Sequence, residues 1–175
     1  MEHEAMVNMQ IQPGFVDIMQ VSPSEAFVLL NIQEHFCTIP LALSIQFLEQ
    51  QRIPKGILTR NNMAPVTHLI QTTGVNFEKI VTRECFQPTK PSPLPLLHIC
   101  VDTWNLQPQC VMMVGDHLDD LLCGRNANCV TVLLKNSTNS HFAPQADFVV
   151  NSLAEIVLLL REGFELAPRT VQSKQ

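Results

Sequence analysis

The chain has 175 residues, 46% hydrophobic and 15% charged, with a formal net charge of −5 at pH 7. This length is typical of one domain with a substantial core, and so few charged residues argue against long disordered tracts. Because nucleic-acid surfaces need clustered Lys and Arg, and the 11 basic residues here are scattered, we expect no nucleic-acid partner.

No apolar run is long enough to span a bilayer, so we expect no membrane partner. The six cysteines form no Cys-x-x-Cys pair, and several lie within apolar runs. We interpret them as reduced, buried thiols of an intracellular protein rather than as disulfides or a zinc site. The acidic opening, Met1 to Met6, has the features of neither a secretory signal nor a transit peptide.

Residues 1–40 have no regular pattern. Met1 to Gln12 is compatible with an amphipathic helix that Pro13-Gly14 ends, and one run, 27–31, is strand-like.

From residue 41 onward, predicted helices alternate with predicted strands, which is typical of βαβ units and a parallel sheet. Helical spacing of apolar residues predicts helices over 41–51, 63–72, 96–104, 118–127 and 153–160. Short apolar runs predict strands over 55–59, 77–81, 111–114, 129–134 and 147–150. A polar loop is predicted over 135–144, and the last residues are expected to form a disordered tail.

The most informative stretch is 111–127. Its apolar run ends in Gly115-Asp116, and Asp120 follows four residues later, inside the predicted helix. Open α/β sheets bind ligands at the carboxyl ends of their strands, and two carboxylates there suit Mg²⁺, which prefers oxygen ligands. The alternative is that Asp116 only caps the helix and Asp120 is only a surface charge.

Two further residues have the same kind of placement. Thr59 ends a predicted strand before Arg60-Asn61-Asn62, where a hydroxyl and free N–H groups can hold an anion; the alternative is an ordinary helix cap. Lys90 lies on an irregular segment before a helix, where it can neutralise a phosphate or simply be a solvated lysine.

In this order, these features resemble the haloacid dehalogenase superfamily of phosphohydrolases over about residues 41–165. The matching motifs are 56–61, Lys90-Pro91-x-Pro93 and Gly115-Asp116-x-x-x-Asp120. The likeness is greatest to phosphoglycolate-phosphatase-like members, especially a plant branch that reads Leu-Leu-His-Ile-Cys before the last motif, as residues 96–100 do here.

The resemblance implies an α/β fold: a Rossmann-like parallel sheet with flanking helices over 41–165, preceded by an incomplete helical cap remnant and irregular insertion over 1–40, with a tail over 166–175. It also implies a Mg²⁺-dependent phosphatase of a small phosphorylated metabolite. Thr59, Lys90 and Asp116 would be catalytic, and Arg60 and Asn61 would join Thr59 and Lys90 in binding phosphate. Asp116 would ligate Mg²⁺, and Asp120, the second metal-site residue, would hold a metal-bound water or Lys90.

One part of the family pattern is missing. Its first motif, Asp-x-Asp-x-Thr, supplies the nucleophilic Asp, and no Asp-x-Asp occurs before Thr59. Asp17 has Met19 where the second Asp should be. The run 27–33 has the right shape but carries Asn31 and Gln33, amides in place of carboxylates, and we interpret that likeness as coincidence.

We therefore expect a truncated chain whose first motif lies upstream of Met1. Its central strand would be lost with that motif, and residues 27–30 are a candidate to fill the gap. We expect an intracellular protein of the cytoplasm or a plastid, and the sequence leaves both open because a targeting segment would be lost together with the motif.

Three functions remain in competition. The first is the phosphatase. The second is a catalytically inactive fragment or pseudoenzyme that keeps a phosphate and metal pocket. The third, a flavodoxin-like or receiver-type regulatory domain, is disfavoured because such a domain needs an acidic pair at an early strand.

Overall fold

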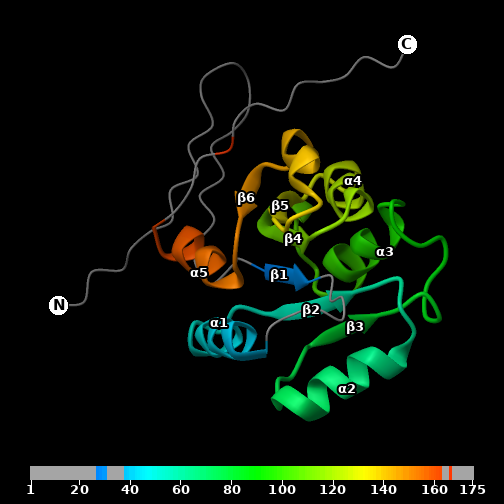
Figure 1. The fold of residues 1–175 in the computed structure, drawn as a ribbon. Coiled ribbons are helices and arrows are strands. Elements are labelled where there is room, and N and C mark those ends of the chain that lie inside the picture. The colour runs from blue at the N-terminus through cyan, green and yellow to red at the C-terminus, as the bar shows by residue number, and fades with distance from the viewer. Residues whose placement is uncertain (1–26, 31–37, 163–165, 167–175) are drawn as a thin grey trace.

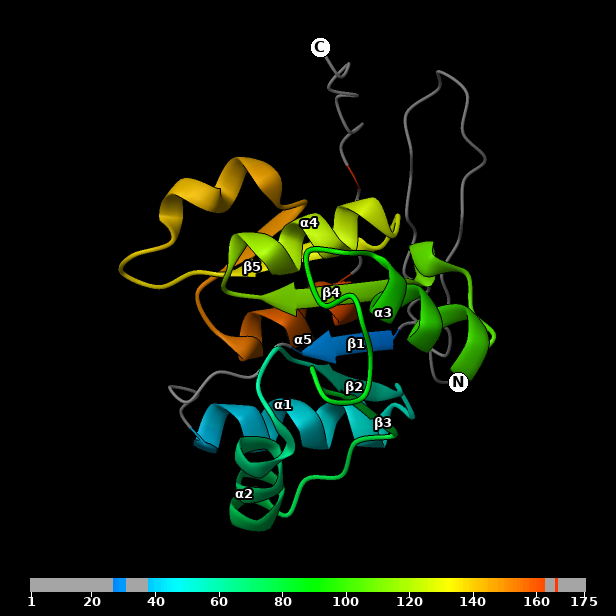
Figure 2. The same cartoon turned by 90° about the vertical axis from the view of Figure 1, so that its right-hand side faces the viewer.

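The computed structural model describes residues 27–30, 38–162 and 166, with side chains from Leu43 onward. Six parallel strands form one sheet in the order β3-β2-β1-β4-β5-β6, with helices on both faces (Figures 1 and 2). This architecture confirms the expected Rossmann-like α/β fold.

The strands are short, as expected for a small parallel sheet. They are β1 (Phe27–Leu30), β2 (Lys55–Leu58), β3 (Lys79–Val81), β4 (Val111–Gly115), β5 (Val130–Leu134) and β6 (Phe148–Val150). The helices are α1 (Thr38–Gln50), α2 (Met63–Thr73), α3 (Leu94–Leu97), α4 (Leu118–Asn126) and α5 (Leu153–Glu162).

The sequence missed two local features. The helix predicted over 96–104 begins earlier, at Leu94, and continues after α3 as a π-helical segment, His98–Thr103. The loop predicted over 135–144 contains a 3₁₀ helix, Ser140–Gln145. Neither feature has a distinctive apolar period, so pattern alone does not reveal it.

Strand β1 corrects the boundary predicted at residue 41. It pairs in parallel with both β2 and β4, with Leu30 beside Ile57 on one side and Val114 on the other. The candidate run 27–30 therefore fills the central position of the sheet, and the expectation that the central strand is lost from this chain is wrong. The sequence pattern marked this short apolar run only as strand-like, and its pairing with β2 and β4 places it at the centre of the sheet. The predicted cap remnant, Asp17, Asn31 and Gln33, and the residues after 166 lie outside the described residues.

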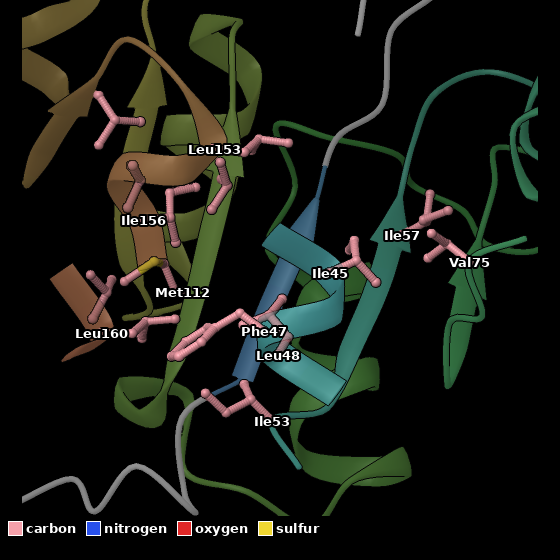
Figure 3. Packing of buried hydrophobic residues seen from close by; sticks show 14 of the residues in the cluster. Ile45, Phe47, Leu48, Ile53, Ile57, Val75, Met112, Leu153, Ile156 and Leu160 are labelled. Atoms are coloured by element: carbon pink, nitrogen blue, oxygen red, sulfur yellow. The ribbon is translucent and has the colours of Figure 1, made fainter. Parts of the chain in front are cut away.

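Side chains of the strands alternate between two cores, one on each face of the sheet. On β4, Met112 and Val114 face one core, whereas Val111 and Met113 face the other. Helices α1, α2 and α5 cover the first face, and α3, the π-helical segment and α4 cover the second. Figure 3 shows the first core, where Phe47 and Leu48 of α1 approach the α5 side chains.

Five cysteines lie among the described residues, and all five are free thiols. Cys100, Cys123 and Cys129 are buried, as the sequence suggested, whereas Cys85 is exposed. In the same part of the chain, no helix is both long and apolar enough to cross a membrane.

The sheet reverses its direction of winding between β1 and β4. From β1 the chain proceeds to β2 and β3 on one side, and from β4 it proceeds to β5 and β6 on the other. A ligand site in an open α/β sheet is expected at such a switch point, beyond the carboxyl ends of the strands. Thr59 and Asp116 directly follow β2 and β4 at that edge.

Gly124 sets how closely α4 packs on the sheet. A Cβ at this position would lie 2.6 Å from Thr131 Cγ2 and 3.1 Å from Met113 Cβ. Thr131 cannot rotate away easily, because it is fully buried and its hydroxyl donates to Asp147 Oδ2 over 2.8 Å.

We predict that Gly124→Ala lowers the free energy of unfolding by about 1–2 kcal/mol, because overpacking outweighs the gain in helix propensity. Denaturant unfolding measures it. Thr131→Ser removes the obstructing methyl group but keeps the hydroxyl, so the double variant should recover most of the loss. A double variant no more stable than Gly124→Ala would refute this packing explanation.

Candidate active site

The turn after β2 holds a buried hydroxyl. Thr59 is 3% exposed, and its N–H donates to Val81 O over 3.0 Å, which extends the β2–β3 pairing. Its Oγ1 accepts from the Asn61 N–H over 3.1 Å. Asn62, rather than Thr59, caps helix α2, with its side chain accepting from Ala64 N. The helix-cap alternative for Thr59 is therefore wrong, and its hydroxyl hydrogen remains available as a donor.

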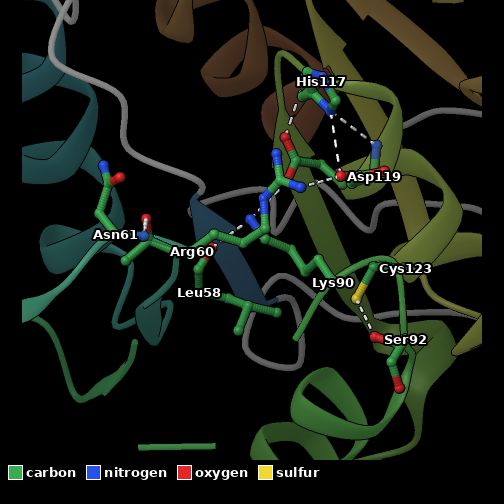
Figure 4. Close-up of polar contacts among 10 residues, drawn as sticks. Leu58, Arg60, Asn61, Lys90, Ser92, His117, Asp119 and Cys123 are labelled. Carbon is green, nitrogen blue, oxygen red and sulfur yellow. Dashed lines mark hydrogen bonds and ion pairs between the residues drawn. The ribbon is translucent and has the colours of Figure 1, made fainter. Parts of the chain in front are cut away.

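Lys90 is buried at the same edge, so it is not a solvated surface lysine. Its Nζ donates to Leu58 O over 2.8 Å and to Asp120 Oδ1 over 2.6 Å. The side chains of Lys90 and Asp120 are 1% and 2% exposed. This ion pair connects the end of β2, the segment before α3 and the first turn of α4 (Figure 4).

Asp120 is held on its other side by the chain just after β4. Its Oδ2 accepts from the His117 N–H over 3.1 Å, in the manner of a capping box. A Cβ on Gly115 would lie 2.4 Å from Asp120 Oδ2, so only glycine allows this approach. Of the two expected roles, Asp120 has the contact with Lys90. Since both its oxygens are engaged, it is poorly placed as a direct metal ligand.

The segment carrying Lys90 is also fixed to α4 by a thiol. Cys123 Sγ donates to Ser92 O over 3.1 Å. Burial raises the pKa of Cys123 to about 12, so it remains a neutral donor.

Asp116 differs from these paired groups. Its Oδ1 is buried and has no hydrogen-bond partner among the described residues. Burial, followed by the nearby charge of Asp120, raises the pKa of the Asp116 carboxyl above its usual range, and a backbone hydrogen bond, then His117 and Lys90, oppose this rise. A buried carboxylate oxygen without a partner is costly unless a cation satisfies it.

Arg60 reaches across the site, although the sequence indicated only a phosphate role for it. Its guanidinium forms an ion pair with Asp119 in the first turn of α4, a contact that sequence reasoning missed (Figure 4). His117 Nδ1 accepts from the Asp119 N–H over 3.3 Å. The Asn61 side chain points away from Lys90 in Figure 4.

Within the described part of the chain, no three His, Cys, Asp or Glu side chains gather into a group able to hold a metal. Mg²⁺ needs fewer protein ligands than that, since it usually keeps several waters and takes one or two carboxylates. Asp116 can supply one such carboxylate. Asp120 is not a ligand in this arrangement, and its role is to hold Lys90 at the site.

The Lys90–Asp120 pair generates a stability prediction. Lys90→Met should lower the free energy of unfolding by about 3–5 kcal/mol, because it leaves a buried carboxylate without its cation. Lys90→Met combined with Asp120→Leu should recover most of that loss in chemical denaturation. Lys135→Met, at an exposed position, is the matched control, with an expected change within about 0.5 kcal/mol. Equal stabilities of Lys90→Met and Lys135→Met would contradict a buried ion pair between Lys90 and Asp120.

Asp116 generates a pH prediction for the metal-free protein. Folding raises the pKa of Asp116, so the protonated carboxyl favours the folded state. This contribution to the free energy of unfolding is complete below the unfolded pKa of about 3.9 and is lost as the pH rises through the folded pKa. Asp116→Asn cannot ionise, so its Tm should exceed the wild-type Tm at pH 7. The gap should close as the pH falls towards about 4. A gap that is independent of pH would contradict the burial of this carboxyl.

A family model described as haloacid dehalogenase-like hydrolase matches residues 34–134. The chain is 39% identical over 168 residues to an uncharacterized hydrolase of Saccharomyces cerevisiae, covering 91% of this chain and 64% of that protein. It is 42% identical over 131 residues to a haloacid dehalogenase-like hydrolase domain-containing protein of Arabidopsis thaliana, covering 70% and 52%. A phosphoglycolate phosphatase of Chromobacterium violaceum is 31% identical over 118 residues, covering 66% and 53%. The chain thus spans about half to two thirds of the length of these relatives.

Solved structures share the fold. A predicted phosphoglycolate phosphatase from Haemophilus somnus superposes with a TM-score of 0.64 at 19% identity, covering 69% of this chain and 56% of that chain. The core domain of a putative phosphoglycolate phosphatase from Streptococcus pneumoniae superposes with a TM-score of 0.60 at 19% identity, covering 77% of this chain and 93% of that chain. The family match over more than half of the chain, and the relative that covers nine tenths of it, lead to one conclusion: this chain belongs to the haloacid dehalogenase-like hydrolases.

Proposed function

We propose that the carboxyl edge of the sheet binds Mg²⁺ together with the phosphoryl group of a small phosphorylated metabolite. The observation that carries this proposal is the buried Asp116 oxygen, which has no hydrogen-bond partner among the described residues. The buried Lys90 pairs with Asp120, four residues after Asp116 and in the first turn of α4, so its ammonium lies at the same edge of the sheet. A cation ligand beside a fixed ammonium group suits a phosphate ester bound with Mg²⁺.

Each residue has a distinct task in this proposal. The Lys90 ammonium has three hydrogens, two of which bond Leu58 O and Asp120, so one is left for a phosphoryl oxygen. The Thr59 hydroxyl can donate to a second phosphoryl oxygen while still accepting from Asn61. Asp116 would hold Mg²⁺, whose charge offsets that of the phosphoryl oxygens.

Arg60 and Asn61 are less direct candidates for phosphate binding. The Asn61 N–H is engaged by Thr59, and the Arg60 guanidinium pairs with Asp119. A phosphate would have to compete with Asp119 for Arg60. We therefore assign the principal phosphate contacts to Thr59 and Lys90.

The substrate class rests on relatives. Several proteins similar to this chain are phosphoglycolate phosphatases, which supports a small phosphorylated metabolite as the ligand. The family resemblance implies hydrolysis through an Asp nucleophile at the tip of the first strand.

A second function, binding without turnover, is favoured by a specific observation. Around the site, Asp120 pairs with Lys90 and Asp119 pairs with Arg60, while Asp116 is the proposed cation ligand. None of these three is then free to attack phosphorus. The residue that follows central strand β1 in the sequence is Asn31, an amide that lies outside the described residues.

The metal proposal predicts that Mg²⁺ raises the Tm of the wild type, because a ligand that binds only the folded state stabilises it. Asp116→Asn should weaken Mg²⁺ binding at least about tenfold in calorimetry. Asp119→Asn removes a neighbouring carboxylate that already has a partner, so it should change the affinity far less. Equal effects of the two substitutions would remove the basis for Asp116 as the cation ligand.

The turnover proposal predicts that the purified chain binds phosphate with Mg²⁺ but hydrolyses an aryl phosphate only at a residual rate, since electrostatics without a nucleophile gives little catalysis. Because β1 occupies the central position in the sheet, Asn31→Asp with Gln33→Asp should raise the rate by orders of magnitude. Asn31→Asp with Gln33→Asp and Asp116→Asn is the inactive control. Robust wild-type turnover that Asp116→Asn abolishes would overturn the view that this chain lacks a nucleophile.

A further inference from the structure

A buried amide lies beside the proposed cation ligand. Asn139 is 3% exposed and belongs to the segment between β5 and β6. In Figure 2 this segment, coloured yellow to orange, lies on the side towards which β1 and β4 point. Asn139 Nδ2 donates to Asp116 O over 2.8 Å and to Leu134 O over 3.0 Å. Its Oδ1 accepts from the Asn136 N–H over 2.7 Å.

These bonds are specific to asparagine. Both amide hydrogens go to main-chain carbonyls at the ends of adjacent strands, just after the last β4–β5 pair, Gly115 with Leu133. Aspartate has no such hydrogens to donate, and glutamine is one methylene longer. The amide therefore bridges the two strands where their pairing ends, and it satisfies a main-chain carbonyl on each side.

The bond to Asp116 is made to its main-chain carbonyl and does not involve its carboxylate. Since Asp116 Oδ1 has no partner among the described residues, no hydrogen bond at that atom orients the carboxylate. The direction of that oxygen therefore follows from the backbone at residue 116, whose carbonyl Asn139 holds. Partners of this kind, one step removed from a metal, typically change metal affinity 10- to 100-fold when mutated.

We propose that Asn139 is a positioning residue for the cation site, an inference that rests on the proposed role of Asp116. It acts through the Asp116 main chain and touches neither the cation nor the phosphate. Removing the Asn139 amide leaves Asp116 in place but allows its carboxylate to adopt other orientations.

The experiment measures Mg²⁺ affinity by calorimetry for the wild type, Asn139→Ala, Asp116→Asn and the double variant. Asn139→Ala should weaken Mg²⁺ binding about tenfold. In the Asp116→Asn background the same change should have almost no further effect, because a residue that acts through Asp116 is coupled to it. Phosphate affinity measured without Mg²⁺ should stay unchanged, since Lys90 and Thr59 belong to other loops.

Asn136→Ala is the matched control. Asn136 lies in the same segment, but its side chain only accepts, from the Thr138 N–H and hydroxyl over 2.9 Å each. It should therefore leave Mg²⁺ affinity unchanged. If Asn139→Ala does not fold, Asn139→Ser replaces it in the same comparison of the wild type, the two single variants and the double variant.

The outcomes separate the two proposals. If Asp116→Asn leaves Mg²⁺ binding intact, the proposed cation ligand itself is wrong. If Asp116→Asn weakens binding but Asn139→Ala does not, only the positioning role is overturned. Additive effects of the two substitutions, or an equal loss of phosphate binding in Asn139→Ala, would mean general structural damage and would also overturn it.

Discussion

The buried ion pair between Lys90 and Asp120 is the constraint on which the geometry of the site depends. It joins three segments that are remote in sequence: the end of β2 through Leu58 O, the segment before α3, and the first turn of α4. Two buried charges seldom add much net stability, because desolvation offsets their attraction. Their effect here is positional, since neither group can leave the other without exposing an uncompensated buried charge. Gly115 makes the pair possible, because any side chain there would collide with Asp120.

This pair also determines how charge is distributed at the sheet edge. Three carboxylates, Asp116, Asp119 and Asp120, lie near two cationic side chains, Lys90 and Arg60. Asp119 and Asp120 are the partners of those cations, so the excess negative charge remains on Asp116. The raised pKa of Asp116 reflects this arrangement, since burial and Asp120 both disfavour its ionised form. A divalent cation would reverse that preference.

The central strand adds a second constraint. Because β1 pairs with β2 and β4 at once, it fixes the separation of the loops that carry Thr59 and Asp116. The switch point of the sheet therefore lies between the proposed phosphate donor and the proposed cation ligand. In the family that this chain resembles, the nucleophile occupies the tip of that strand, and here the strand leads into amides in the sequence.

The sequence by itself determined the fold class and the placement of Thr59 and Asp116, whereas the burial of Lys90 at the same edge came from the tertiary structure. Alternating strands and helices admit few topologies, and a polar residue directly after a buried strand must emerge at the carboxyl edge. Only the tertiary structure decided which side chains are partners. Lys90 and Asp120 are 30 residues apart, and Arg60 and Asp119 are 59 apart, so no local pattern could pair them. Asn139 gave no signal, because its role depends on reaching the carbonyls just beyond the last β4–β5 pair, far from it in sequence. The four residues of β1 were a strand-like run and a candidate for the central position, and only their pairing with two neighbouring strands decided it.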